Sequence, residues 1–299
     1  MKDRFVAALV GGIALCAGHA TGQQLLMVPD STDDRIMLFN SFDGSLVNAD
    51  FINEGVVGDV MSTPIEAQLV GNEIWVTDQI GDVVNRFSAD GSSFLGAISN
   101  PSMDNLRGFE VVGNTALVAG IDGVHRIDVN TQTYLGLNEY RGADSSLFDI
   151  YNHNGILLAA NNGVEDIDII DLNGDYVQTV IDSDGVTSID FPEQIAGLDN
   201  GNFMAAGFSS PSGIYEFTTE GDDLGIIAAA DAGPRGAYEL GNGNIMYTNG
   251  SGVFVFDINT GGATQVASGS ARFISELVPA PSSATLLAFA GLCASRRRR

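Results

Sequence analysis

The chain has 299 residues, and its 38 acidic residues against 13 lysines and arginines give a formal net charge of −25 at pH 7. Such a surface repels phosphate groups, so neither nucleic acid nor anionic lipid is an expected partner. The two cysteines, Cys16 and Cys293, lie near the two ends, so the body has no disulfide, thiol nucleophile or cysteine metal site.

The first twenty residues have the pattern of a secretory signal. Lys2 and Arg4 form a basic start, an apolar stretch runs from Phe5 to Ala17, and Gly18-His19-Ala20 fits a small-x-small cleavage site. We therefore predict a signal peptide over residues 1–20 and an exported protein.

Six segments of the body share one ending, in which an apolar residue is followed within three or four positions by an acid or Asn and usually by Gly. The segments are "LFNSFDGSLV", "RFSADGSSFLG", "RIDVNTQTYLG", "IIDLNGDYVQ", "EFTTEGDDLG" and "VFDINTGGAT". Their apolar anchors lie 39 to 48 residues apart and are Phe39, Phe87, Ile127, Ile170, Phe217 and Phe256. A period of about 43 residues with such turns predicts a β-propeller with about four strands per repeat.

Five repeats also contain an earlier hairpin, such as "EAQLVGNEIWVTD" and "GAYELGNGNIMYTNG". The first repeat begins at "QQLLMVPDSTDDRIMLFN" with no strand before it. A matching strand occurs at the other end, where "ARFISEL", Ala271 to Leu277, resembles the start of "PRGAYEL" and has no hairpin after it. We therefore predict a six-bladed ring closed by the C-terminal strand, residues 271–277, which completes blade one and leaves no open blade edge.

The body, residues 21–277, is predicted to be a single all-β domain, because no long segment has the 3.6-residue period of an amphipathic helix. "VPDSTDDRIMLFNSFDGSLV" and "VTDQIGDVVNRFSADGSSFLG" are similar to NHL and YVTN-type propeller repeats, in which V-x-D precedes a polar turn, R-I-x-x-F and D-G. The resemblance implies a propeller with four-stranded blades. It implies little about function, since such propellers host binding, scaffolding and lyase activities alike.

The last 22 residues, 278–299, have three parts. A motif with Val278, Pro279 and Pro281 precedes an apolar run, which ends at an arginine cluster. The cluster consists of Arg296, Arg297, Arg298 and Arg299. The run from Ser282 to Ser295 would measure about 21 Å as a helix, which is short for a membrane span. The arginines would stay on the cytoplasmic side.

This tail resembles the PEP-CTERM sorting signals of bacterial exopolysaccharide-associated proteins, with Ala280 in place of the family's Glu. The resemblance implies an exosortase-like processing enzyme as partner and a transient membrane association. The alternative is a plain C-terminal membrane anchor. Both place the body outside the cytoplasmic membrane, at the cell surface or in the extracellular space.

Little in the body indicates catalysis. His125 lies on a predicted strand and His153 at a hairpin tip, and neither has the neighbours of a Ser-His-acid triad. Asp182 and Asp184 have spacing that calcium could use, but ordinary turn chemistry explains them as well. We predict no catalytic residues, no metal site and no cofactor, with calcium as the alternative.

Propeller topology places two sets of loops on one face, around the mouth of the central channel. The loops before each inner strand contribute Arg107, Arg235, Arg272, Glu66 and Glu193. The loops between the second and third strands contribute Asp30, Asp78, Asn162 and Asn249. The arginines either pair with these acids across blade boundaries or form a pocket for an acidic sugar or carboxylate.

These features favour an exported, noncatalytic propeller that binds polysaccharide or another protein at the cell surface or in the matrix. One alternative is an extracellular enzyme of the lactonase or lyase type. In that case Glu193, Asn162 and Asn249 would hold a metal at the channel mouth, as resemblance to gluconolactonases implies. Another is a purely structural surface protein.

Overall fold

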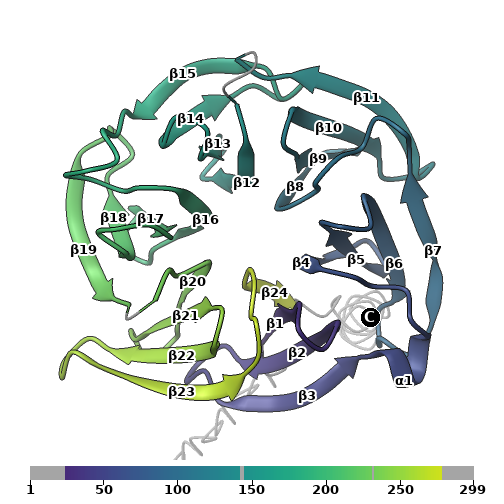
Figure 1. Cartoon of the computed structure of the whole chain (residues 1–299), viewed down its shortest axis with the longest axis horizontal. Coiled ribbons are helices and arrows are strands. Elements are labelled where there is room, and N and C mark those ends of the chain that lie inside the picture. The colour runs from purple at the N-terminus through teal and green to yellow at the C-terminus, as the bar shows by residue number, and fades with distance from the viewer. Residues whose placement is uncertain (1–23, 142–144, 231, 278–299) are drawn as a thin grey trace, which may run out of the picture.

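A computed structural model describes residues 24–141, 145–230 and 232–277. Within them the chain forms six sheets of four antiparallel strands, arranged as blades in a ring (Figure 1), whose central axis we call the channel. One short helix, α1 (Glu54–Val57), follows blade one. The all-β, six-bladed prediction is confirmed. The predicted signal peptide and tail lie outside the described residues.

The strands of each blade are given from the channel outward. Blade one comprises β24 (Ser275–Leu277), β1 (Leu25–Asp30), β2 (Arg35–Asn40) and β3 (Leu46–Ile52), and blade two β4 (Pro64–Val70), β5 (Glu73–Asp78), β6 (Val83–Ser88) and β7 (Phe94–Ser99). Blade three comprises β8 (Phe109–Val112), β9 (Thr115–Ala119), β10 (Gly123–Asp128) and β11 (Thr133–Glu139), and blade four β12 (Leu147–His153), β13 (Ile156–Asn161), β14 (Asp166–Ile170) and β15 (Tyr176–Ile181). Blade five comprises β16 (Pro192–Gly197), β17 (Phe203–Gly207), β18 (Gly213–Phe217) and β19 (Asp223–Ala229), and blade six β20 (Gly236–Glu239), β21 (Ile245–Asn249), β22 (Gly252–Asp257) and β23 (Gly262–Ser268).

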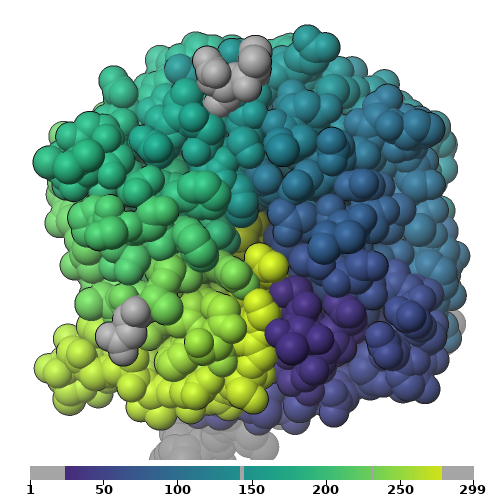
Figure 2. All heavy atoms as spheres, in the orientation of Figure 1, coloured from purple at the N-terminus to yellow at the C-terminus, as the bar shows by residue number. Residues whose placement is uncertain are grey.

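The ring closes as predicted, through a C-terminal strand that pairs with the first strand of the chain. In β24, Leu277 lies opposite Leu25 of β1, and an isolated bridge joins Ala271 to Asp30. Figure 2 shows the C-terminal residues in yellow directly beside the N-terminal residues in purple. Because β24 pairs with β1, the first strand of the chain is not left as an unpaired sheet edge.

The repeat anchors explain why the blades pack. All six of these apolar residues are buried, with at most 8% of any side chain exposed. They occur near the end of the third strand of each blade, in clusters shared with the neighbouring sheet. In five blades an Asp or Asn side chain then accepts a backbone N–H bond in the turn to the outer strand, and in blade five Thr218 does so. In blade six, for example, Asp257 accepts hydrogen bonds from the backbone of Asn259 and Thr260. Burial of this repeated apolar set stabilises the ring.

Each inner strand begins at one end of the channel, which we call the mouth, and runs towards the opposite end. For β24 the mouth lies next to Ala271, and Leu277 lies at the opposite end. Three inner strands start with a β-bulge, a shift of their register against the second strand of the blade. The described residues contain no helix long and apolar enough to cross a membrane.

Candidate functional site

Backbone hydrogen bonds between blades define equivalent positions at the mouth. The N–H of Gly108 donates to the carbonyl of Phe148, that of Gln194 to Arg235, and that of Phe273 to Ile65. One residue of each blade therefore occupies the same place at the start of the inner strand. We call this set the mouth ring; in order from blade one to blade six it is Arg272, Ile65, Arg107, Phe148, Glu193 and Arg235.

Three of the six mouth-ring residues are the arginines expected from the sequence, and each is held by neutral groups only. Arg107 donates from Nε to Asn105 Oδ1 and from Nη1 to Ser146 Oγ at 2.9 Å. Arg235 donates from Nη1 to Ser270 Oγ at 2.7 Å.

Arg272 donates from Nε to Ser31 Oγ at 2.9 Å. Within the described part of the chain, none of the three arginines has a carboxylate at ion-pair distance. Nη2 of each arginine, and Nη1 of Arg272, also find no acceptor there. The mouth therefore holds several unused guanidinium donors.

Glu193 is the single acid of the mouth ring and is only 3% exposed. Its carboxyl group accepts no hydrogen bond from any described residue, and its oxygens are not completely enclosed by protein atoms. Burial raises the pKa of Glu193 to about 8, although the charges of Arg235, Arg272 and Arg107 act in the opposite direction. The three guanidinium groups therefore surround a carboxyl group without touching it.

Burial also lowers the pKa of Arg107 and of Arg272 to about 10 in each case. Both groups remain charged at neutral pH, but their hydration is reduced. An incompletely hydrated guanidinium with a free donor binds an anion more strongly than an exposed one, because the surrounding dielectric is lower.

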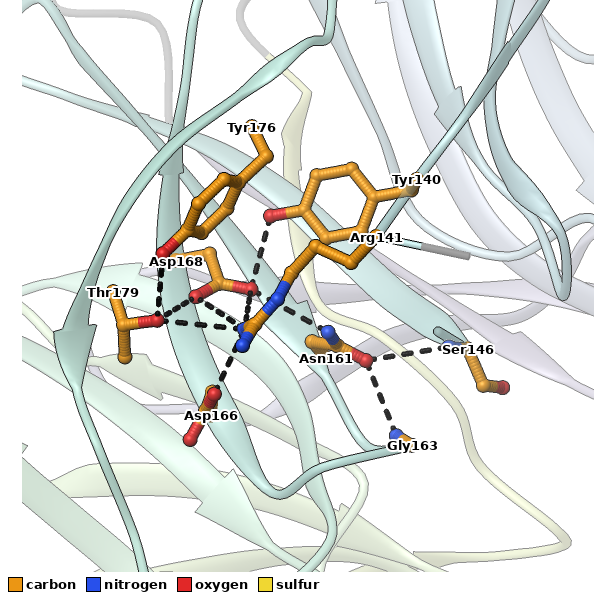
Figure 3. Close-up of polar contacts among 9 residues, drawn as sticks. All are labelled: Tyr140, Arg141, Ser146, Asn161, Gly163, Asp166, Asp168, Tyr176 and Thr179. Atoms are coloured by element: carbon orange, nitrogen blue, oxygen red, sulfur yellow. Dashed lines mark hydrogen bonds and ion pairs between the residues drawn. The ribbon is translucent and has the colours of Figure 1, made fainter. Parts of the chain in front are cut away.

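Arg141 shows how an arginine is satisfied elsewhere in the protein (Figure 3). Its Nη1 contacts Asp166 at 2.8 Å and Asp168 at 3.1 Å. Asp168 also accepts hydrogen bonds from Tyr140 at 3.0 Å and from Thr179 at 2.7 Å. This cluster joins the end of blade three to blade four, and its arginine is paired with both aspartates.

The same cluster helps to position the mouth. Asn161 donates to Asp168 and accepts from the backbone N–H of Ser146 (Figure 3). The hydroxyl of Ser146 accepts a hydrogen bond from Nη1 of Arg107. The guanidinium carbon of Arg107 also lies 3.8 Å from the centre of the Phe148 ring. Arg107 is therefore fixed in place before any ligand arrives.

One residue further along each inner strand lies a second set, which we call the inner ring. From blade one to blade six it consists of Phe273, Glu66, Gly108, Asp149, Gln194 and Gly236. Its three polar side chains accept backbone N–H bonds from the next blade: Glu66 from Phe109 at 2.6 Å, Asp149 from Ile195 at 2.8 Å and Gln194 from Ala237 at 3.1 Å.

Glycine at Gly108 and Gly236 leaves room for these bonds. A Cβ on Gly108 would lie 2.1 Å from Asp149 Oδ1, and one on Gly236 would lie 2.7 Å from Gln194 Oε1. Burial raises the pKa of Glu66 to about 7, and that of Asp149 well above its usual range. The inner ring is thus a structural belt that ties neighbouring blades together.

Below the inner ring the channel widens into a cavity of about 480 Å³. Its lining includes Glu110, Tyr151, Tyr238 and Glu276 as well as the polar inner-ring side chains. Tyr238 donates to Glu276 at 2.5 Å. The two ends of the channel therefore differ in chemistry, with arginines at the mouth and carboxyl groups below.

Glu66, which sequence topology places at the mouth, lies in the inner ring instead. The four residues expected between the second and third strands mostly serve turns. The side chain of Asp78 accepts hydrogen bonds from the backbone N–H groups of Ser62 and Thr63. The side chain of Asn249 accepts hydrogen bonds from the backbone N–H groups of Ser251 and Gly252.

Asp30 pairs with Arg35 at 3.1 Å. In blade four it is Asn161, next to the expected Asn162, that bonds the turn. Asp184 accepts from the backbone N–H groups of Val186 and Thr187, as the turn interpretation of this segment expects.

Both described histidines lie outside the mouth ring. His125 is buried in blade three, with Nδ1 3.2 Å from Tyr134 Oη, and His153 Nε2 is 2.9 Å from the carbonyl of Gly201. In residues 24–141, 145–230 and 232–277, no three His, Cys, Asp or Glu side chains are grouped so that they could hold a metal ion.

No family model matches the chain, and no curated protein is similar to it in sequence. Solved structures are similar in fold. A chain of a nidogen–laminin complex superposes with a TM-score of 0.65 at 12% identity, covering 85% of this chain and 98% of that one.

Virginiamycin B lyase from Staphylococcus aureus, in a catalytically inactive variant with quinupristin, gives a TM-score of 0.59 at 13% identity and covers 86% and 93% of the two chains. A candidate 6-phosphogluconolactonase from Bacteroides fragilis gives 0.56 at 14% identity, with coverage of 86% and 99%. At these identities the likeness shows the propeller fold alone.

Proposed function

We propose that the protein is an exported, noncatalytic propeller at the cell surface or in the extracellular matrix, and that its mouth binds carboxylate groups of an acidic polysaccharide. The observation that carries the proposal is the set of three convergent mouth-ring arginines with unused donors in a chain of net charge −25. Guanidinium forks match carboxylates in geometry, and partial burial strengthens the contact.

The direction of the closing strand supports surface display. Residues 278–299 continue from Leu277, which lies at the end of the channel opposite the mouth. If this tail is held in a membrane, or is processed there by an exosortase-like enzyme, the mouth faces away from the membrane. A polysaccharide could then reach the arginines from the extracellular side.

The binding test uses the purified full-length chain in mild detergent, titrated calorimetrically with an oligogalacturonate and with a neutral oligosaccharide of equal length. We expect binding of the acidic probe only.

Replacing Arg107, Arg235 or Arg272 with alanine should weaken binding of the acidic probe by about 1–3 kcal/mol per substitution. Arg126→Ala is the matched control, because Arg126 lies on β10, outside the mouth ring, and also has no ion pair among the described residues. Equal binding of both probes would contradict the proposal, and cleavage of the probe would favour the lyase or lactonase alternative.

The export test replaces Arg296, Arg297, Arg298 and Arg299 with glutamate. We expect altered orientation or processing, because clustered arginines stay on the cytoplasmic side of a membrane. Cell fractionation and the mass of the mature chain are the readouts. An unchanged mature mass together with unchanged surface exposure would contradict the tail's role.

A further inference from the structure

The carboxyl group of Glu193 is the least expected feature of a site that binds anions. It occupies blade five of the mouth ring, directly beside Arg235 of blade six and followed by Arg272 of blade one. The structural acids nearby are all bonded: Asp149 accepts from the backbone of Ile150 and Ile195. Glu193 alone is 97% buried and yet accepts no hydrogen bond from the described residues.

A carboxyl group in this position competes with any incoming anion. If a ligand carboxylate binds the free donors of Arg235 and Arg272, it comes close to Glu193 in a site with little water. Two ionised carboxylates in one such site repel each other strongly, and the usual outcome is that they hold one proton between them. The shared proton also makes a short, charge-assisted hydrogen bond.

We infer that Glu193 determines which ligands the mouth accepts, by sharing one proton with the ligand's carboxylate among the three guanidinium groups. The inference rests on the proposed function and specifies its ligand chemistry: the site binds a carboxylate together with a proton. Where Glu193 is ionised before binding, the proton comes from solvent, and no bond between heavy atoms changes. A uronic acid residue of a polysaccharide supplies the required group.

The surroundings of Glu193 agree with this role. The charged groups that act on it are Arg235, Arg272 and Arg107, while Phe148 on the neighbouring blade-four strand is apolar. The negative charge of Asp104 raises the pKa of Arg107 but does not contribute to the pKa shift of Glu193. Since burial raises the pKa of Glu193 to about 8, its ionisation falls in a range where the arginines remain charged.

The test measures affinity for an oligogalacturonate at pH 7 and pH 9 by calorimetry, with the full-length chain. Binding to the wild type should be about tenfold weaker at pH 9, because only about a tenth of the free protein then carries the proton. Measurements in two buffers of different ionisation enthalpy should show uptake of about one proton per ligand at pH 9. Glu193→Gln should bind equally at both pH values and take up no proton.

Glu110→Gln is the matched control, because Glu110 lines the lower cavity and should leave the pH dependence unchanged. Loss of binding in Arg235→Ala, combined with the same pH dependence in Glu193→Gln as in wild type, would overturn the inference and leave the proposed function intact. Absence of binding by wild type and by Glu193→Gln at both pH values would overturn both. If Glu193→Gln fails to fold, the proton count of the wild type decides, and a count of zero at pH 9 overturns the inference.

Discussion

The mouth ring and the inner ring lie one residue apart on the same six strands, yet they treat polar side chains in opposite ways. In the inner ring, every polar side chain accepts a backbone N–H from a neighbouring blade. In the mouth ring, three arginines and Glu193 converge and leave each other unbonded. The contrast separates polar groups that hold the ring together from polar groups that are available to a ligand, although all of them are largely buried.

The largest effect should come from removing the strand that contributes to both rings. A chain ending at Gly269 loses Arg272 from the mouth ring and Phe273 from the inner ring, and it exposes the edge of β1. We expect aggregation, because an open strand edge and apolar core become accessible. Size-exclusion chromatography is the measurement, and a chain ending at Leu277 is the control. A soluble monomer with an unchanged melting temperature would show that closure contributes nothing.

A comparison of Asp149→Ala with Arg272→Ala tests the difference between the inner ring and the mouth ring directly. Asp149→Ala leaves the buried N–H groups of Ile150 and Ile195 without their acceptor, and should lower the free energy of unfolding by about 2–4 kcal/mol. Arg272→Ala should change it by less than about 1 kcal/mol, because it breaks one hydrogen bond to Ser31. Chemical denaturation measures both. Equal losses would mean that the mouth arginines are structural.

Gly108→Ala should have a somewhat smaller effect on stability than Asp149→Ala. The added Cβ would approach Asp149 Oδ1 to 2.1 Å, so the inner strands of blades three and four must separate, at a cost of about 1–3 kcal/mol. Gly262→Ala is the control, since the nearest atom to its added Cβ would be Thr260 Oγ1 at 3.6 Å. A normal melting temperature for Gly108→Ala would show that the inner ring tolerates more volume than the contacts indicate.

The repeat period was sufficient to predict the number of blades and the closing strand, because both depend on patterns that recur every blade. The bulge at the start of the inner strand was not predicted, and it decides which ring a residue joins. "PIEAQ" and "PEQIA" align on Pro64 and Pro192, which pairs Glu66 with Gln194 rather than with Glu193. That alignment would have placed Glu66 in the inner ring. Asp149 was missed because its role depends on an N–H from another blade, which no local pattern reveals.

A further expected effect is a dependence of stability on pH that belongs to Glu193. Its pKa in the folded protein, about 8, lies above the ordinary value of 4.5. The folded state therefore keeps a proton that the unfolded state releases, so this contribution to stability is complete below pH 4.5 and is lost as the pH rises through about 8. Glu193→Gln removes the charge but keeps the shape. Relative to the wild type, its melting temperature should be higher at pH 9 than at pH 5, because only the wild type loses stability as this carboxyl group ionises. Glu220→Gln, at an exposed position, should show no such change in melting temperature relative to the wild type.

A lower melting temperature of Glu193→Gln than of the wild type at pH 9 would mean that the ionised carboxylate is stabilised by the three arginines. The mouth ring would then satisfy its own charges, as the inner ring does, and the distinction between the two rings would disappear.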